Sequence, residues 1–215
     1  MNPDLQRDLM SALERPHRLG TIGGNLEDQL AHCASFSSVL GQVIQADKSD
    51  FGANGIDLGT GGGLPGIALA ALHPKMAWTL VDMRAARADE VERTILGLRY
   101  QDRVEVIAAE AQHVGHQPKY REQFDIAVAR AFGPPSVTAE CAAGVLVVGG
   151  VFIVSEPPHR GGDVDRWNEA GLTTLGFGKP VPKTADGQHF MTMTKVAPTP
   201  DNFPRLPPRS TRGWS

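Results

Sequence analysis

"DLGTGGGLPGIALA", residues 57–70, carries the most specific indication of the fold in this sequence. It places five glycines and a proline between a short apolar run and a second apolar run with helical spacing. A buried strand that turns through glycines into a helix is typical of the first unit of cofactor-binding α/β folds, because the bare backbone lets a ligand approach closely. The stretch therefore predicts a strand, a ligand-binding turn and a helix.

The chain that follows alternates between short apolar runs and amphipathic runs. Strands are expected at residues 56–58, 78–82, 104–108, 125–129 and 151–155, and helices at 65–72, 85–98 and 135–146. Further on, residues 163–170 fit a helix, and residues 172–177 with 190–196 fit a closing hairpin with a longer loop. This alternation predicts an α/β, Rossmann-like fold with a mostly parallel seven-stranded sheet flanked by helices.

Three regions are expected along the chain. Residues 4–14 and 26–44 carry apolar side chains at three- and four-residue steps, so residues 1–50 are interpreted as an N-terminal helical cap. Residues 51–196 form the predicted ligand-binding domain. Residues 197–215 hold prolines and arginines and are typical of an extended tail.

Composition bounds the class of protein. The 215 residues carry a formal net charge of -3, so any contact with nucleic acid must be local. We expect a monomer. No membrane span is expected, because no apolar stretch approaches the roughly 20 residues that a span needs. Since no signal-peptide pattern begins the chain, we expect a cytoplasmic protein. Cys33 and Cys141 have no metal or redox spacing, and His113 with His116 lacks companion ligands, so no metal site is expected.

Two ligands compete for the glycine turn. Gly61, Gly63 and Gly66 satisfy the spacing of a dinucleotide-binding loop, which would favour a nicotinamide dehydrogenase. Asp57 favours the other ligand, because a carboxylate at the strand end repels a pyrophosphate. S-adenosylmethionine has no phosphate and carries a positive amino group and sulfonium, so it suits the acid-x-Gly-x-Gly pattern of Asp57, Gly59 and Gly61.

Acidic residues follow the next two expected strands. Asp82 ends "TLVD", where its carboxylate can accept both hydroxyls of a ribose, although it could also cap the following helix. Ala109 and Glu110 follow the third strand, where a backbone N–H and a carboxylate suit the edge of an adenine. Since three strand ends meet at one edge of a parallel sheet, these residues predict an S-adenosylmethionine site.

A family resemblance rests on "DLGTGGGLPGIALA", "LVDMRAAR", "AAEA", "FDIAVARAF" and "NFPRLPPR". With these motifs the chain resembles the bacterial guanine-N7 methyltransferases of small-subunit (16S) ribosomal RNA, also called the glucose-inhibited division protein B family. The resemblance implies a class I methyltransferase fold and a cofactor site that uses Gly59, Leu64, Ala109, Glu110 and Arg130.

The chain departs from this family pattern at three places. His32 is followed by Cys33, Ala34 and Ser35 where an acid is usual, and only one cation, Arg87, stands where a basic pair is usual. After the fifth strand the sequence "SEPP", residues 155–158, replaces a frequent lysine. Two of these changes remove positive charge from positions where RNA is expected to lie.

The expected reaction is methyl transfer from S-adenosylmethionine to N7 of a guanine in small-subunit ribosomal RNA. N7 has an exposed lone pair and no proton, so alignment is the main requirement and no catalytic residue is expected. Two alternatives stay open: a methyltransferase acting on a small molecule, and a catalytically silent S-adenosylmethionine-binding module. The ribosomal RNA or small ribosomal subunit would be gripped by cations, with these candidates: Arg84, Arg87, Arg205 and Arg209.

Overall fold

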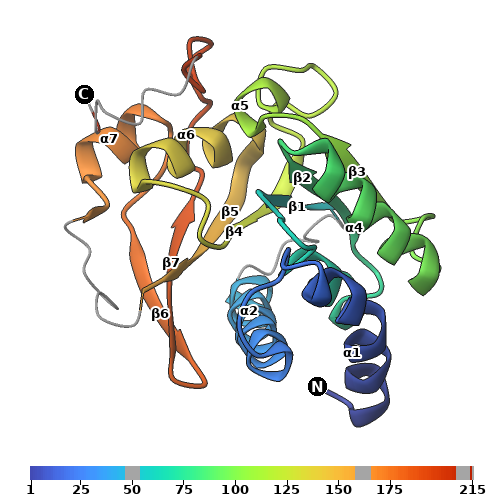
Figure 1. Cartoon of the computed structure of the whole chain (residues 1–215). Coiled ribbons are helices and arrows are strands. Elements are labelled where there is room, and N and C mark those ends of the chain that lie inside the picture. The colour runs from blue at the N-terminus through green and yellow to red at the C-terminus, as the bar shows by residue number, and fades with distance from the viewer. Residues whose placement is uncertain (47–53, 158–165, 207–213, 215) are drawn as a thin grey trace.

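A computed structural model describes residues 1–46, 54–157, 166–206 and 214 (Figure 1). Its centre is a seven-stranded sheet in the order β3-β2-β1-β4-β5-β7-β6. β1 to β5 are parallel to one another, whereas β7 runs antiparallel to both β5 and β6. The strands are β1 (Asn54–Leu58), β2 (Ala77–Asp82), β3 (Val104–Ala108), β4 (Phe124–Ala129), β5 (Leu146–Glu156), β6 (Val181–Ala185) and β7 (Gln188–Thr194).

Helices cover both faces of the sheet (Figure 1). On one face lie α1 (Pro3–Arg18), α2 (Leu26–Ala46), α3 (Gly66–Leu72) and α4 (Ala85–Leu98). The other face carries α5 (Ala111–Val114), α6 (Pro135–Val145) and α7 (Glu169–Thr174). The predicted fold class is therefore confirmed, and the strands and helices expected between residues 56 and 155 all form, with shifted ends at several of them.

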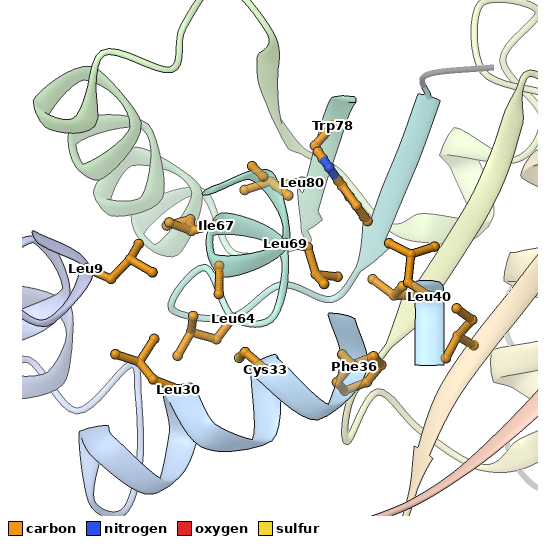
Figure 2. Close-up of a cluster of buried hydrophobic side chains, with 14 of the residues drawn as sticks. Leu9, Leu30, Cys33, Phe36, Leu40, Leu64, Ile67, Leu69, Trp78 and Leu80 are labelled. Carbon is orange, nitrogen blue, oxygen red and sulfur yellow. The ribbon is translucent and has the colours of Figure 1, made fainter. Parts of the chain in front are cut away.

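The two N-terminal helices share a hydrophobic core with the sheet. Leu9 of α1 and Leu30 and Phe36 of α2 belong to the same buried cluster as Leu69 of α3 and Trp78 of β2 (Figure 2). Burying a large apolar side chain contributes about 1.5–3 kcal/mol, so this cluster ties α1 and α2 firmly to the sheet. The helices thus pack as a layer of the sheet domain.

The closing hairpin differs from the prediction. Residues 172–174 belong to α7, and the strand that pairs with β7 is β6, which begins only at Val181. A two-residue turn joins the strands, and its members, Asp186 (φ 49°) and Gly187 (φ 73°), both have positive φ. Asp-Gly is a favoured hairpin turn because it adopts this backbone readily, so the missed signal was "DG" at 186–187. The helix expected at 163–170 begins outside the described residues, and α7 begins at Glu169.

Residues 197–206 lie against the fold, contrary to the expectation of an extended tail. Thr199 Oγ1 donates to the carbonyl oxygens of Ala143 (2.8 Å) and Leu175 (3.2 Å). Arg121, which precedes β4, contacts the same segment, because its Nη2 donates to the Thr199 carbonyl at 2.9 Å. Hydrogen bonds to the backbone therefore anchor this segment. Within the described residues no helix is both long and apolar enough to span a membrane.

Candidate functional site

A cavity of about 480 Å³ lies at the carboxyl ends of the first four strands. Gly59 after β1, Asp82 at the end of β2, Ala109 and Glu110 after β3, and Phe132 after β4 all line it. β1 and β4 are neighbours in the sheet, so the cavity lies where the direction of the strand order reverses. Open α/β sheets bind ligands at this position, and the volume falls in the usual range for ligand pockets, roughly 300–1,000 Å³.

Asp57 lies beneath the glycine turn, not in the cavity wall. The side chain is fully buried, and its Oδ2 accepts hydrogen bonds from the Thr60 hydroxyl (2.7 Å) and the Gly66 N–H (2.9 Å). Gly66 has no room for a side chain, because an added Cβ would lie 2.2 Å from Leu80 Cδ2. Asp57 therefore holds the start of α3 against the end of β1. A direct contact with a ligand stays a prediction.

Ionisation of the Asp57 carboxyl is unfavourable in this buried position. Burial raises the pKa of its carboxyl from 3.8 to about 6, although the two hydrogen bonds and the charge of Arg130 act in the opposite direction. Oδ1 is buried and has no hydrogen-bond partner among the described residues. A buried carboxylate that is only partly satisfied is stabilised by a nearby cation, so the site favours a positively charged ligand over a phosphate.

Asp82 organises the adjoining part of the cavity. Its Oδ2 accepts a hydrogen bond from the Gly61 N–H (2.9 Å), and its Oδ1 accepts one from the Arg84 N–H (2.9 Å). Gly61 has a φ of +60°, which glycine adopts without the steric cost of a side chain. Asp82 thus joins the glycine turn to the loop before α4. Arg84 and Arg87 also line this cavity, and Arg87 Nη1 lies 3.9 Å from Asp82 Oδ2.

Ala109 and Leu64 have structural contacts of their own, and their roles toward a cofactor stay predictions. The Ala109 N–H, expected to meet an adenine, donates to the Asp82 carbonyl at 3.1 Å, because the pairing of β2 with β3 continues by one residue. The Leu64 side chain is buried between α2 and α3 and does not line the cavity (Figure 2). Glu110 does line it, and its Oε2 lies 3.6 Å from His113 Nδ1.

Arg130 points toward the N-terminal helices. Its Nη1 donates to Gln29 Oε1 on α2 at 2.6 Å, and the side chain is absent from the lining of the cavity. Burial, together with the charge of Arg130, lowers the pKa of His32 to about 4. Arg130 therefore connects the end of β4 to α2. Its role toward a cofactor stays a prediction.

Phe132 is the functional candidate that the sequence analysis missed. An added Cβ on Gly59 would lie 2.5 Å from Phe132 Cδ2, so the aromatic ring packs directly on the glycine turn. Ala131, the preceding residue, has a φ of 52°, an uncommon conformation for a non-glycine residue that often marks functional loops. The motif "ARAF", residues 129–132, contains Ala131 and Phe132, but the prediction made from it named only Arg130.

The C-terminal arginines have a different environment from the one expected. The Arg205 guanidinium pairs with Glu140 of α6, with Nε 2.8 Å from Oε1, and the Arg205 backbone N–H donates to Oε2 at 3.0 Å. Arg205 therefore helps to close the last described segment onto the fold. Arg209 lies outside the described residues. Binding of RNA by either arginine stays a prediction.

Solved structures with the same architecture define the class of fold. A protein from Corynebacterium glutamicum superposes with a TM-score of 0.61 at 13% identity, covering 89% of this chain and 90% of that one. An O-methyltransferase from neocarzinostatin biosynthesis, solved in complex with S-adenosylmethionine, superposes with a TM-score of 0.52 at 19% identity, covering 80% and 60%. The strand order, with β7 inserted antiparallel between β5 and β6, is that of a class I methyltransferase fold.

Sequence relatives identify the family. Residues 28–160 match the family model of GidB, described as rRNA small subunit methyltransferase G. Curated proteins of that name are 34% identical in Trichormus variabilis (72% of this chain, 64% of that protein) and 32% identical in Pelotomaculum thermopropionicum (88% and 79%). The chain belongs to the rRNA small subunit methyltransferase G family. It spans about two thirds of the length of the first of these relatives.

Proposed function

We propose that this protein transfers the methyl group of S-adenosylmethionine to N7 of a guanine in small-subunit ribosomal RNA. The observation that carries the proposal is the convergence of Gly59, Asp82 and Glu110 on one cavity at the strand-order reversal, in a chain of this family. A ribosomal RNA substrate supports a cytoplasmic location, which is part of this proposal. We propose that it acts there as a monomer on ribosomal RNA or the small ribosomal subunit.

Asp82 and Glu110 hold the adenosine part of the cofactor in this proposal. The Asp82 carboxylate is already fixed by two backbone N–H groups, so it presents its remaining lone pairs to the ribose hydroxyls in a defined direction. Glu110 borders the same cavity from the end of β3. Asp57, under the turn, supplies negative charge near the positive end of the cofactor.

The reaction makes small demands on acid–base chemistry. S-adenosylmethionine supplies an electrophilic methyl group, and the chain has to hold the guanine N7 about 3–3.5 Å from it in line. Burial raises the pKa of Cys33 to about 12 and that of Cys141 still further, so both thiols are neutral near pH 7. Neither is a nucleophile under these conditions, as expected for direct transfer without a covalent enzyme intermediate.

The cofactor part of the proposal is tested by calorimetry. S-adenosylhomocysteine should bind the wild-type protein, and NAD should not. Asp82→Ala should weaken binding by about tenfold to a hundredfold, because it removes hydrogen bonds to a charged group. The matched control is Asp89→Ala, which removes an exposed carboxylate from α4 and should leave affinity unchanged. Binding of NAD in place of S-adenosylhomocysteine would refute the cofactor assignment.

The acceptor is tested by mapping N7-methylguanine in ribosomal RNA from a wild-type and a deletion strain. One N7-methylguanine should disappear from the small-subunit RNA of the deletion strain and return with the wild-type gene but not with Asp82→Ala. An unchanged pattern would favour a small-molecule acceptor or a silent module. Transfer to purified small-subunit RNA then establishes whether the assembled particle is needed.

A further inference from the structure

A second cavity adjoins the candidate cofactor cavity. Its volume is about 270 Å³, and it shares three wall residues with the first: Ala131, Phe132 and Gly133. The rest of its wall comes from the start of α6, the carboxyl end of β5, and the residues before α7. Since methyl transfer brings donor and acceptor into contact, a space that shares its wall with the cofactor cavity is positioned for the acceptor.

Glu156 of β5 organises this second cavity. Its side chain is 1% exposed, its Oε2 accepts from Arg166 Nη1 at 2.6 Å, and its Oε1 accepts from Trp167 Nε1 at 2.8 Å. A buried carboxylate requires such partners, because an unpaired charge in the interior is strongly destabilising. The pair therefore holds the Arg166 guanidinium beside the cavity, where 23% of its side chain is exposed.

We propose that Arg166, oriented by Glu156, binds a phosphate of the acceptor RNA strand next to the transfer site. The sequence lacks a cation directly after the fifth strand, and Glu156 stands in that region instead. In the folded chain Glu156 pairs with Arg166, which lies ten residues later in the sequence. A cation is therefore present at the end of β5. The inference rests on the proposed function, and it names the group that holds the acceptor.

A phosphate suits Arg166 better than the guanine base does. Methylation at N7 moves positive charge onto the base, so a guanidinium against the base would oppose the reaction. A phosphate keeps its negative charge throughout. The planar guanidinium carries five N–H donors and matches phosphate oxygens in a two-pronged geometry, and a carboxylate that fixes its orientation reduces the entropy lost on binding.

The test compares Arg166→Gln with a matched arginine elsewhere. Arg93 of α4 donates from Nη1 to Glu90 Oε2 at 2.9 Å, and Glu90 has a side chain 5% exposed, so Arg93→Gln also removes an arginine from a buried glutamate. Arg93 lines neither of the two cavities described above. Methyl transfer to small-subunit RNA is measured over a range of salt concentrations, together with S-adenosylhomocysteine affinity and the unfolding midpoint.

Arg166→Gln should raise KM for RNA about tenfold at low salt, as expected for one lost charged contact, with kcat and S-adenosylhomocysteine affinity unchanged. The plot of log(kcat/KM) against log salt should become shallower by about 0.7–0.9, the contribution of one phosphate. Arg166→Lys should recover part of the affinity because it keeps the charge. Arg93→Gln should match the wild type in KM, kcat, S-adenosylhomocysteine affinity and salt slope.

The two proposals fail in different ways. If the wild type methylates the RNA and Arg166→Gln behaves like Arg93→Gln in KM and salt slope, the role of Arg166 is refuted and the proposed function stands. If the wild type transfers no methyl group to RNA, the proposed function is refuted. RNA binding in the presence of S-adenosylhomocysteine then decides the role of Arg166, since an equal salt slope for wild type and Arg166→Gln refutes that too.

Discussion

The hydrogen bonds of the glycine turn and those that hold the segment after β7 differ widely in sequence separation. In the half that carries β1 to β3, the hydrogen bonds that shape the site are short in sequence: Thr60 and Gly66 lie three and nine residues from Asp57. The contact from Gly61 to Asp82 spans only 21 residues. Such contacts form within one or two consecutive units of the fold, so a short motif contains both partners.

The half that begins at β4 depends on distant partners. Lys195 and Glu122 are 73 residues apart, and Arg205 and Glu140 are 65 apart. In both pairs a residue late in the chain meets an acid near β4 or on α6. The glycine turn is thus stabilised by local hydrogen bonds, whereas the segment after β7 is closed onto the fold by contacts between distant residues.

The largest effect is expected from Lys195→Ala. Lys195 is fully buried, and its Nζ donates to Glu122 Oε1 (2.9 Å) and to the carbonyl oxygens of Ala143 (3.2 Å) and Leu146 (3.3 Å). Removing it leaves these acceptors without their cation, so the free energy of unfolding should fall by about 3–5 kcal/mol. Urea denaturation measures this loss.

The same variant separates the two halves of the sheet. At a temperature where the variant stays folded, its S-adenosylhomocysteine affinity should stay within about twofold of wild type, because distant sites act independently. Lys179→Ala is the control: Lys179 is 82% exposed and pairs with Glu169 at 3.6 Å, so its loss should cost less than about 0.5 kcal/mol. Equal losses in the two variants would refute a closure role for Lys195.

An intermediate effect is expected from Asp57→Asn, and it depends on pH. The pKa of Asp57 is higher in the folded protein (about 6) than its ordinary value of 3.8, so the folded state binds more protons between these values. Stability contributed by this group is therefore present at low pH and lost as pH rises through that window, by about 3 kcal/mol in order of magnitude. Asparagine has no carboxyl proton to lose, so its contribution should not change with pH.

The measurement is the difference in unfolding free energy between wild type and Asp57→Asn at a series of pH values. His32, whose pKa is lowered to about 4, acts with the opposite sign but is common to both proteins and cancels. The affinity of wild type for S-adenosylmethionine should also rise as Asp57 ionises, and that of the variant should not. A difference curve independent of pH would contradict the charged state assigned to Asp57.

The smallest effect is expected from Gly187→Ala in the hairpin turn. No atom lies within 4 Å of an added Cβ, so the cost comes only from the positive φ of 73° and should be about 1 kcal/mol. Gly41 of α2 has similar space but helical backbone, so Gly41→Ala should instead stabilise the protein by about 0.5–1 kcal/mol. Thermal unfolding distinguishes the opposite signs, and an equal loss in both variants would contradict the assignment of the Gly187→Ala cost to its positive φ.

Local pattern explains what could be predicted about the fold. The strand at 104–108 and the helix at 85–98 have the predicted ends, because period and apolar content are properties of consecutive residues. The strand before β7 was misplaced, since Val181–Ala185 is largely exposed at the edge of the sheet and has little apolar pattern. Only pairing with β7 across the Asp186–Gly187 turn identifies it.

The candidate site divides in the same way. Gly59, Asp82 and Glu110 were predicted from their places at strand ends, and all three line the cavity. Phe132 was missed because its contact with Gly59 joins residues 73 positions apart in the sequence. Asp57 was correctly predicted to lie next to the glycine turn. That its side chain lies under the turn follows from how α3 packs on β1.

Three features follow from short stretches of sequence: the alternation of strands and helices, the glycine turn, and the acids at or just after the ends of two strands. These depend on backbone preferences and on spacing within a few residues, which no distant contact alters. The partners of three arginines become clear only in the folded chain: Arg205 pairs with Glu140, Arg130 donates to Gln29, and Arg166 pairs with Glu156 beside the second cavity. A charged side chain can pair with any of several polar groups, and the partner that it finds depends on which of them the folded chain brings within reach.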